Sequence, residues 1–255
     1  MTPETHHDDW DAHWDRYAGS ASQNPAQRMR HELVARILRN GAQATMRLFD
    51  IGSGQGDMLA KLRPLFPKAE FFGAELSASG VAISKKKVPD ATFLVEDLFS
   101  PTSELAKFHG WATDAVCSEV LEHVDDPTAF LRAASPYLAD NARLVVTVPG
   151  GPMSAFDKHI GHRQHFTKES ISRIFVESGF TVERVYRTGF PFFNLYRSVV
   201  IARGEKLAQD VEGSGGASSA AASLAMAVFR FLFHFNLTDS PFGWQVVAVG
   251  KKNKV

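Results

Sequence analysis

Short apolar segments alternate with helix-like segments along residues 46–148. Apolar strands are expected at 46–51, 70–75, 92–97, 114–118 and 142–148. Helices are expected between them, at 58–65, 80–87, 104–108 and 128–138. This alternation predicts an α/β fold, in which a doubly wound, mostly parallel sheet carries helices on both faces.

The segments on either side extend the pattern. A helix is expected at 25–38, because its apolar residues recur on one side. Beyond residue 148, the expected elements are a helix at 168–178, a strand at 181–187 and a strand at 244–249. The sheet is therefore predicted to have seven strands.

The first strand runs into a turn with alternating glycines. Asp50 ends the strand, and Gly52, Gly54 and Gly56 follow. Glycine has no Cβ, so the backbone can turn sharply and lie directly against a ligand. The spacing differs from that of dinucleotide binders, and no lysine follows as in a phosphate loop, so pyrophosphate is not the expected ligand. The acid favours a cationic or hydroxyl-rich partner.

Polar groups also follow the next strands. Glu75 ends the second strand about 20 residues past the glycine turn, where doubly wound folds place the carboxylate that binds ribose hydroxyls. Asp97 ends the third strand, and Ser118 with Glu119 follows the fourth. Because the carboxyl ends of parallel strands lie at one edge of a sheet, these groups are expected to form one site.

With this turn and these acids, the chain resembles the class I S-adenosylmethionine-dependent methyltransferases. The resemblance implies a Rossmann-like sheet whose last strand is antiparallel. The resemblance implies that Gly52 and Gly54 lie against the methionine part of the cofactor and that Glu75 binds the ribose. It also implies that Asp97 and Leu98 lie near the adenine, and that Ser118 and Glu119 line the methyl-donor end. The expected cofactor-binding residues are Asp50, Gly52, Ser53, Gly54, Gly56, Glu75, Leu76, Asp97, Leu98, Ser118 and Glu119.

A candidate catalytic segment follows the fourth strand. If it is helical, Glu119, Glu122 and His123 share one face and can bind a divalent cation. The pattern resembles that of the ubiquinone-pathway O-methyltransferases and of the small-RNA 2'-O-methyltransferases, which implies a metal site with magnesium as the candidate ion. The latter group adds a second histidine downstream, for which His162 is the best match and His159 and His165 are near alternatives. In metal-free methyltransferases the same glutamates cap a helix, and the histidine packs near the cofactor or acts as base.

A second candidate segment, residues 158–167, contains several histidines and follows the fifth strand. His162 and His165 join His123 as candidate catalytic residues, and His159 is an alternative to His162. Any single one of these histidines could equally serve only to bind loop backbone. As a group they favour function, because loops at this edge of a sheet are where function concentrates.

An aromatic-rich insertion separates the last two strands. A Gly/Ser run at 213–219 predicts a loop, and the apolar segment 220–235 predicts a helix that is too short to be a convincing membrane span. The phenylalanines either complete a core or a dimer interface, or form an apolar acceptor pocket. Near the N-terminus, Trp10, Trp14 and Tyr17 either cap the cofactor or pack on the sheet.

The predicted organisation has four parts. These are an N-terminal helical cap (1–40), a cofactor-binding methyltransferase core (41–189), an aromatic-rich cap or lid (190–241), and the final strand with its tail (242–255).

Composition is consistent with a single soluble catalytic domain. The 255 residues are 44% hydrophobic, and the single cysteine excludes an intramolecular disulfide. Lysine plus arginine equals aspartate plus glutamate at 28 each, which disfavours a nucleic-acid substrate. The polar, acidic N-terminus resembles neither a signal peptide nor a membrane span, so a cytoplasmic location is expected.

The expected function is S-adenosylmethionine-dependent methylation, chiefly at a hydroxyl, of a small and partly apolar molecule such as a quinone precursor, a glycosylated metabolite or a polyketide. Two alternatives remain open: RNA 2'-O-methylation, and a non-catalytic member of the fold that binds a partner protein. A homodimer is compatible with the aromatic insertion. The sequence leaves the identity of the acceptor open.

Overall fold

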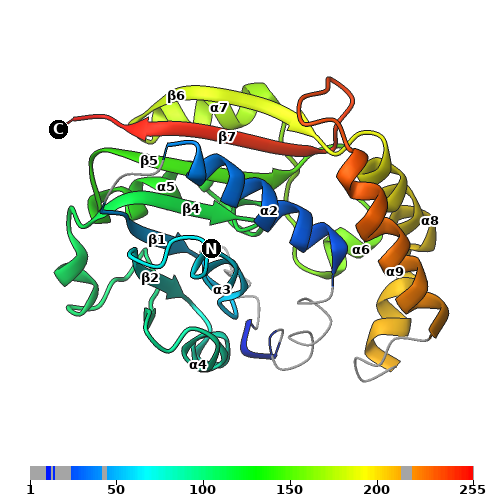
Figure 1. The fold of residues 1–255 in the computed structure, drawn as a ribbon, viewed down its shortest axis with the longest axis horizontal. Coiled ribbons are helices and arrows are strands. Elements are labelled where there is room, and N and C mark those ends of the chain that lie inside the picture. Colours follow the sequence, from blue (N-terminus) through cyan, green and yellow to red (C-terminus); the bar gives the residue numbers. More distant parts are fainter. Residues whose placement is uncertain (1–9, 13, 15–23, 42–44, 214–219, 255) are drawn as a thin grey trace, which may run out of the picture.

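The computed structural model describes residues 10–12, 14, 24–41, 45–213 and 220–254, and among these it forms one seven-stranded sheet with helices on both sides (Figure 1). The strands are β1 (Arg47–Ile51), β2 (Glu70–Glu75), β3 (Thr92–Val95), β4 (Ala112–Ser118), β5 (Leu138–Pro149), β6 (Phe180–Thr188) and β7 (Gln245–Lys252). Their order across the sheet is β3-β2-β1-β4-β5-β7-β6.

The strand directions confirm the predicted fold class. β1 to β5 pair in parallel, whereas β7 runs antiparallel to both β5 and β6. The strand order reverses between β1 and β4, so the carboxyl ends of these two strands border the crevice in which open α/β sheets bind ligands.

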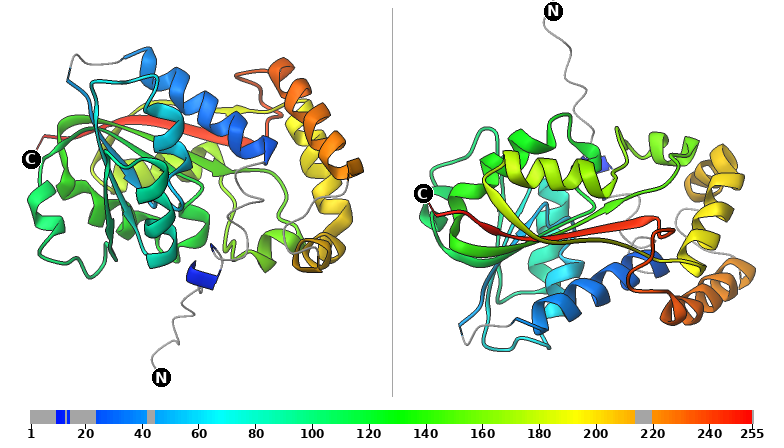
Figure 2. Two further views of the ribbon diagram at one scale, coloured as in Figure 1. Left: turned by 60° about the horizontal axis from the view of Figure 1, so that its bottom comes forward. Right: turned by 90° about the horizontal axis from the view of Figure 1, so that it is seen from above.

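Helices cover both faces of the sheet (Figures 1 and 2). The helices are α2 (Pro25–Arg39), α3 (Asp57–Leu62), α4 (Ala78–Lys87), α5 (Pro127–Ala134), α6 (Ala155–His159), α7 (Lys168–Glu177), α8 (Phe192–Gly213) and α9 (Ala220–Leu232). Four short 3-10 turns are η1 (Leu105–Phe108), η2 (Leu121–His123), η3 (Ser135–Tyr137) and η4 (Phe233–Phe235). One apolar cluster joins α2, α3 and α4 to the sheet, and another joins α5 and α7 to its opposite face.

Local sequence explains several helix ends. The Asn24 side chain accepts a hydrogen bond from the Ala26 amide at 2.9 Å, and Pro25 occupies the first turn of α2. The helix expected at 128–138 is shorter, because Pro136 lacks an amide hydrogen and restricts Ser135. β5 consequently begins at Leu138, four residues earlier than the sequence predicted.

The insertion after β6 forms α8 and α9, which lie together at one end of the sheet (Figure 2). Phe193 and Phe233 are buried in a small cluster with Ala26 from α2. Several other apolar side chains remain exposed on this unit, namely Leu195, Val199, Leu224, Met226, Val228, Phe231 and Phe235. No helix among the described residues is long and apolar enough to cross a membrane.

Some expectations lie outside the described residues. Tyr17 is one, and residues 214–219 of the Gly/Ser run are another. The division of the chain into four parts stays a prediction.

Candidate active site

The glycine turn joins β1 to α3 and depends on a left-handed backbone. Gly52, Gly54 and Gly56 have φ angles of 72°, 53° and 78°. A Cβ on Gly52 would lie 2.7 Å from a methyl carbon of Val120, and one on Gly56 would lie 2.9 Å from Ser84. Both conformation and space therefore require glycine here.

Glu75 is tied to this turn by its carboxylate. One oxygen accepts a hydrogen bond from the Gly54 amide at 2.8 Å, and the other accepts one from the Ser77 amide at 3.0 Å. Burial raises the pKa of Glu75, and these backbone donors partly oppose that shift. The Leu76 amide and the Trp14 side chain are further hydrogen-bond donors that lower its pKa.

Asp50 lies behind the turn at the end of β1. Its side chain is buried, and its Oδ2 atom has no hydrogen-bond partner among the described residues. Burial raises the pKa of Asp50 to about 7, and the nearby Glu75 carboxylate adds to the shift. A buried carboxylate oxygen without a donor is costly, so this position favours a ligand that brings a donor or a positive charge.

The burial of Asp50 predicts a pH-dependent stability. The pKa is about 7 in the folded chain against an ordinary value of 3.8, so the folded state takes up a proton. The contribution of Asp50 to the free energy of unfolding is therefore fully present below about pH 4 and is lost as the pH rises through 7. We expect Asp50→Asn to gain stability over wild type as pH rises, by up to about 3 kcal/mol between pH 5 and pH 8.

Urea unfolding at both pH values measures this effect. Asp140→Asn, at an exposed position of β5, is the matched control and should show no such trend. An Asp50→Asn advantage that stays constant with pH would contradict the prediction.

Residues near the N-terminus cover the glycine turn. A Cβ on Gly54 would lie 2.6 Å from the Trp14 ring, and a Cβ on Gly80 would lie 3.0 Å from it. Asp11 accepts hydrogen bonds from the Ser77 hydroxyl at 2.5 Å and the Ser79 amide at 2.9 Å. For Trp14, this geometry favours a cap over the glycine turn.

The other predicted cofactor residues lie at the same edge of the sheet. Asp97 follows β3 and accepts a hydrogen bond from the Phe99 amide at 2.9 Å. Leu98 and Ser53 are buried, whereas Leu76 is exposed. The Glu96 amide donates to the Glu75 carbonyl at 2.9 Å, which brings the end of β3 beside the end of β2.

Glu119 does not share a helical face with Glu122 and His123. Its φ of 57° places it before the short turn η2. One carboxylate oxygen accepts hydrogen bonds from Thr147 at 3.1 Å and Gln245 at 2.8 Å, and the other lies 3.5 Å from Arg30 Nε. These contacts explain why the expected three-residue face does not form.

Arg30 and Gln245 were not identified by sequence reasoning. Arg30 lies on α2, far from the strand ends in sequence, and only the fold brings it to Glu119. The sequence did give an indication for Gln245, because it is a polar residue at the start of an apolar strand. In the structure it is fully buried. Ser118 is near the same group, with its hydroxyl 2.7 Å from that of Thr147.

A histidine cluster lies beside η2. Glu122 is fully buried, and neither carboxylate oxygen has a hydrogen-bond partner among the described residues. Burial raises the pKa of Glu122 well above its usual value, and Glu119 adds to the shift. The His123 and His162 ring centroids are 4.8 Å apart. Glu122, His123 and His162, but not Glu119, thus come close enough to share a metal ion.

Asp157 completes the cluster and was also missed from the sequence. It caps α6, where its Oδ2 accepts hydrogen bonds from the Ser154 amide and from Arg197 of α8, both at 2.7 Å. Burial alone would raise the pKa of Asp157, but Arg197 and Ser154 outweigh it and hold the pKa at about 2. Burial, with His123 nearby, lowers the pKa of His162 to about 3, so that ring is neutral at pH 7.

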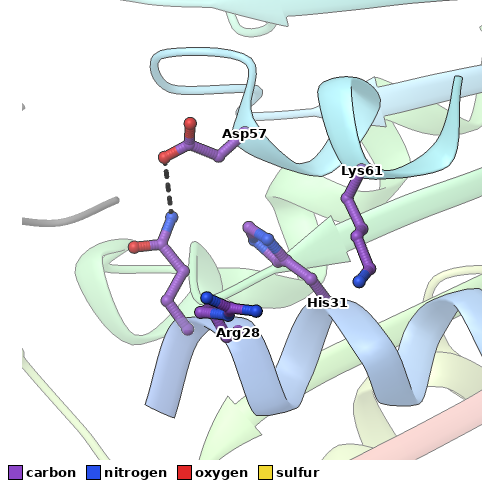
Figure 3. A pocket seen from close by; sticks show the side chains of 5 residues that line it. Arg28, His31, Asp57 and Lys61 are labelled. Atoms are coloured by element: carbon purple, nitrogen blue, oxygen red, sulfur yellow. Dashed lines mark hydrogen bonds between the residues drawn. The ribbon is translucent and has the colours of Figure 1, made fainter. Parts of the chain in front are cut away.

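A separate pocket of about 210 Å³ lies between α2 and α3 (Figure 3). Gln27, Arg28 and His31 line it from α2, and Asp57 and Lys61 line it from α3. Asp57 is held by Lys87 at 2.5 Å. Burial lowers the pKa of His31 to about 3, with Arg30 next in effect. The pocket lies beside the glycine turn, outside the histidine cluster.

A family model described as a methyltransferase domain matches residues 26–185. The match agrees with the glycine turn, the acid on β2 and the strand order. The chain belongs to this methyltransferase family. The match confirms the predicted class I methyltransferase, whereas the narrower ubiquinone-pathway group stays a prediction. No curated protein matches the sequence.

Solved structures share the fold of this methyltransferase at low identity. Phosphoethanolamine N-methyltransferase 2 from Haemonchus contortus, in complex with S-adenosyl-L-methionine, is 17% identical with a TM-score of 0.61, and the alignment covers 98% of this chain and 61% of that one. The chain therefore spans less than two thirds of that enzyme.

Two further structures belong to other organisms. A Haloferax volcanii methyltransferase, bound to the activator Trm112, is 15% identical with a TM-score of 0.64, covering 97% of this chain and 99% of that one. Geranyl diphosphate C-methyltransferase from Streptomyces coelicolor, in a complex that contains Mg²⁺, is 14% identical with a TM-score of 0.55. The alignment covers 87% of this chain and 76% of that one.

Proposed function

We propose that this methyltransferase uses S-adenosyl-L-methionine to methylate a small, partly apolar molecule, with a hydroxyl as the preferred acceptor. The observation that carries the proposal is the glycine turn held by Glu75 in front of Asp50. The three glycines have left-handed backbone, the Glu75 carboxylate is tied to this turn through the Gly54 amide, and Asp50 has an oxygen without a hydrogen-bond partner among the described residues. These features fit a ligand with both hydroxyls and positive charge.

Each part of the cofactor has proposed partners. Gly52 and Gly54 would hold the methionine part, and Glu75 the ribose hydroxyls. Asp97, with Leu98 beside it, would bind the adenine, and Ser118 would line the methyl end. When bound, the cofactor supplies an electrophilic methyl group for in-line displacement. The H. contortus neighbour is crystallised with this cofactor, which supports the proposal.

The chain's own task is then to orient the acceptor and remove its proton. His123 is the proposed base, because it follows the end of β4 and its ring contacts both Trp10 and His162. Glu122, His123 and His162 could instead hold a divalent ion that acidifies the hydroxyl. Glu119 is no part of that proposed set, because Arg30 and Gln245 hold its carboxylate.

A small apolar acceptor suits the surroundings of this site. Arg197 of α8 reaches Asp157 beside the histidines, so the aromatic unit of α8 and α9 borders the cluster. The balanced charge of the chain gives no support to RNA, which proteins bind through basic surfaces. Two of the three neighbours named above are methyltransferases of phosphoethanolamine and of geranyl diphosphate, both of which are small molecules.

Calorimetry with S-adenosylmethionine and its demethylated product tests the cofactor, and transfer of a labelled methyl group to a panel of hydroxylated compounds tests the reaction. Once an acceptor is found, His123→Gln should lower kcat about 10²- to 10⁴-fold while cofactor affinity stays unchanged, as expected on loss of a general base. His159→Gln, at an exposed position nearby, is the control. An absence of cofactor binding would refute the proposal, and an unchanged kcat would remove His123 from it.

A further inference from the structure

Asp157, His162 and His165 bring their side chains together within the β5–α7 connection. His162 Nδ1 lies 3.9 Å from Asp157 Oδ1 and 3.2 Å from His165 Nε2. His165 Nε2 lies 3.9 Å from Asp157 Oδ2. The side chains are almost inaccessible, with exposed fractions of 1%, 9% and 7% for Asp157, His162 and His165. Three potential ligand atoms thus face one small volume.

The two carboxylate oxygens of Asp157 differ in their hydrogen-bond partners. Oδ2 accepts hydrogen bonds from Ser154 and Arg197, which fix the direction of the carboxylate. Oδ1 is buried and has no hydrogen-bond partner among the described residues. Buried polar atoms nearly always have a partner, and leaving a carboxylate oxygen without one is costly. The atom that faces the histidines is therefore the one that requires a ligand.

The tautomer of His165 is suited to the same ligand. Its Nδ1 lies 3.1 Å from the Gly151 carbonyl oxygen. A carbonyl only accepts, so Nδ1 must carry the hydrogen, and in a neutral ring the lone pair is then on Nε2. That lone pair faces His162 and Asp157. Histidines that bind metals commonly donate their other ring hydrogen to a carbonyl in this way.

We propose that Asp157, His162 and His165 bind a divalent transition-metal ion, with zinc as the best match. A tetrahedral zinc ion with bonds of about 2.0–2.1 Å places its ligand atoms roughly 3.3–3.4 Å apart. His162 Nδ1 lies 3.2 Å from His165 Nε2 and 3.9 Å from Asp157 Oδ1, and the ligand atoms of the three residues lie within 4.8 Å of one another, so binding requires the carboxylate to move slightly towards the two rings. Two imidazoles and one carboxylate suit zinc better than magnesium, which prefers oxygen ligands.

This site differs from the proposed set of Glu122, His123 and His162, with which it shares only His162. It does not depend on methyl transfer. Its position suggests what the ion does: it ties α6 to the following loop, and Arg197 carries that connection to α8. Metal binding is therefore expected to stabilise the end of the molecule formed by α6 and α8.

Titration of the metal-free full chain with Zn²⁺, and with Co²⁺ as a spectroscopic probe, tests the site. We expect one ion per chain and a higher Tm with metal. His165→Gln and Asp157→Asn should each weaken affinity at least about 10-fold, in line with the loss of ligands or their supports. His159→Gln and Glu122→Gln, which leave the three ligands intact, should bind as wild type.

His165→Gln is the decisive variant, because Asp157 also caps α6 and its replacement could affect folding. The absence of stoichiometric metal would overturn the proposal. So would binding that survives His165→Gln but is lost in Glu122→Gln, since the ion would then lie on the other side of His162. Calorimetry with S-adenosylmethionine on the metal-free protein tests the methyltransferase proposal separately, because cofactor binding there does not depend on the metal site.

Discussion

Glu75→Ala is expected to lower the affinity for S-adenosylmethionine about 10²- to 10⁴-fold. A hydrogen bond to a charged group contributes about 1.5–3 kcal/mol, and Glu75 is proposed to accept two from the ribose. The variant also leaves the Gly54 and Ser77 amides without their acceptor, so the turn that contacts the methionine part loses its anchor. Both effects act in the same direction.

Calorimetry with the cofactor and with its demethylated product measures the change. Glu70→Ala is the matched control, because Glu70 is at the opposite, exposed end of the same strand. Its affinity should equal that of wild type. Glu75→Gln keeps the shape and half of the acceptor capacity, so its loss should be intermediate. A Glu75→Ala protein that is folded by circular dichroism and binds with unchanged affinity would exclude Glu75 from the cofactor site.

Gly52→Ala is expected to destabilise the folded protein by roughly 2–5 kcal/mol and to remove detectable cofactor binding. A left-handed backbone costs a residue with a Cβ about 1–2 kcal/mol. At Gly52 the added carbon would also lie 2.7 Å from the partly buried Val120, which must move, at a further cost of about 1–3 kcal/mol. Val120 directly precedes η2, so that movement would also disturb His123.

Gly110→Ala separates the two causes. Gly110 has a similar φ of 62°, but a Cβ there would meet nothing within 4 Å. The control should therefore lose only the backbone part of the stability and bind cofactor normally. Urea unfolding and calorimetry on both variants measure the difference. Equal destabilisation at the two positions would show that the contact with Val120 is unimportant.

Much of the sheet could be predicted from local sequence alone. Runs such as Leu48–Ile51, which is apolar apart from Asp50, bury every side chain, and a buried parallel strand is typically rich in apolar residues. The Gly52–Gly56 turn and Glu75 were also identifiable, because the chemistry that needs them is encoded within a few residues of a strand end. Boundaries were less certain, as the early start of β5 after Pro136 illustrates.

The candidate site was only partly predictable. Glu122, His123 and His162 were expected together and lie together, but Glu119 was expected with them and instead contacts Arg30 and Gln245. Its partners come from α2 and β7, at opposite ends of the sequence. Asp157 was overlooked because its local pattern indicates a helix cap, a role that it does have.

The sequence by itself determined the α/β class, the glycine turn and the acids at the strand ends, because periodicity and backbone conformation depend on neighbouring residues. Only the tertiary structure decided which carboxylates receive a partner. Arg197 neutralises one oxygen of Asp157 from α8, and Trp14 lies over Gly54 from the N-terminal side. Burial and charge pairing arise from residues distant in the chain, so they exist only once the sheet and helices have packed.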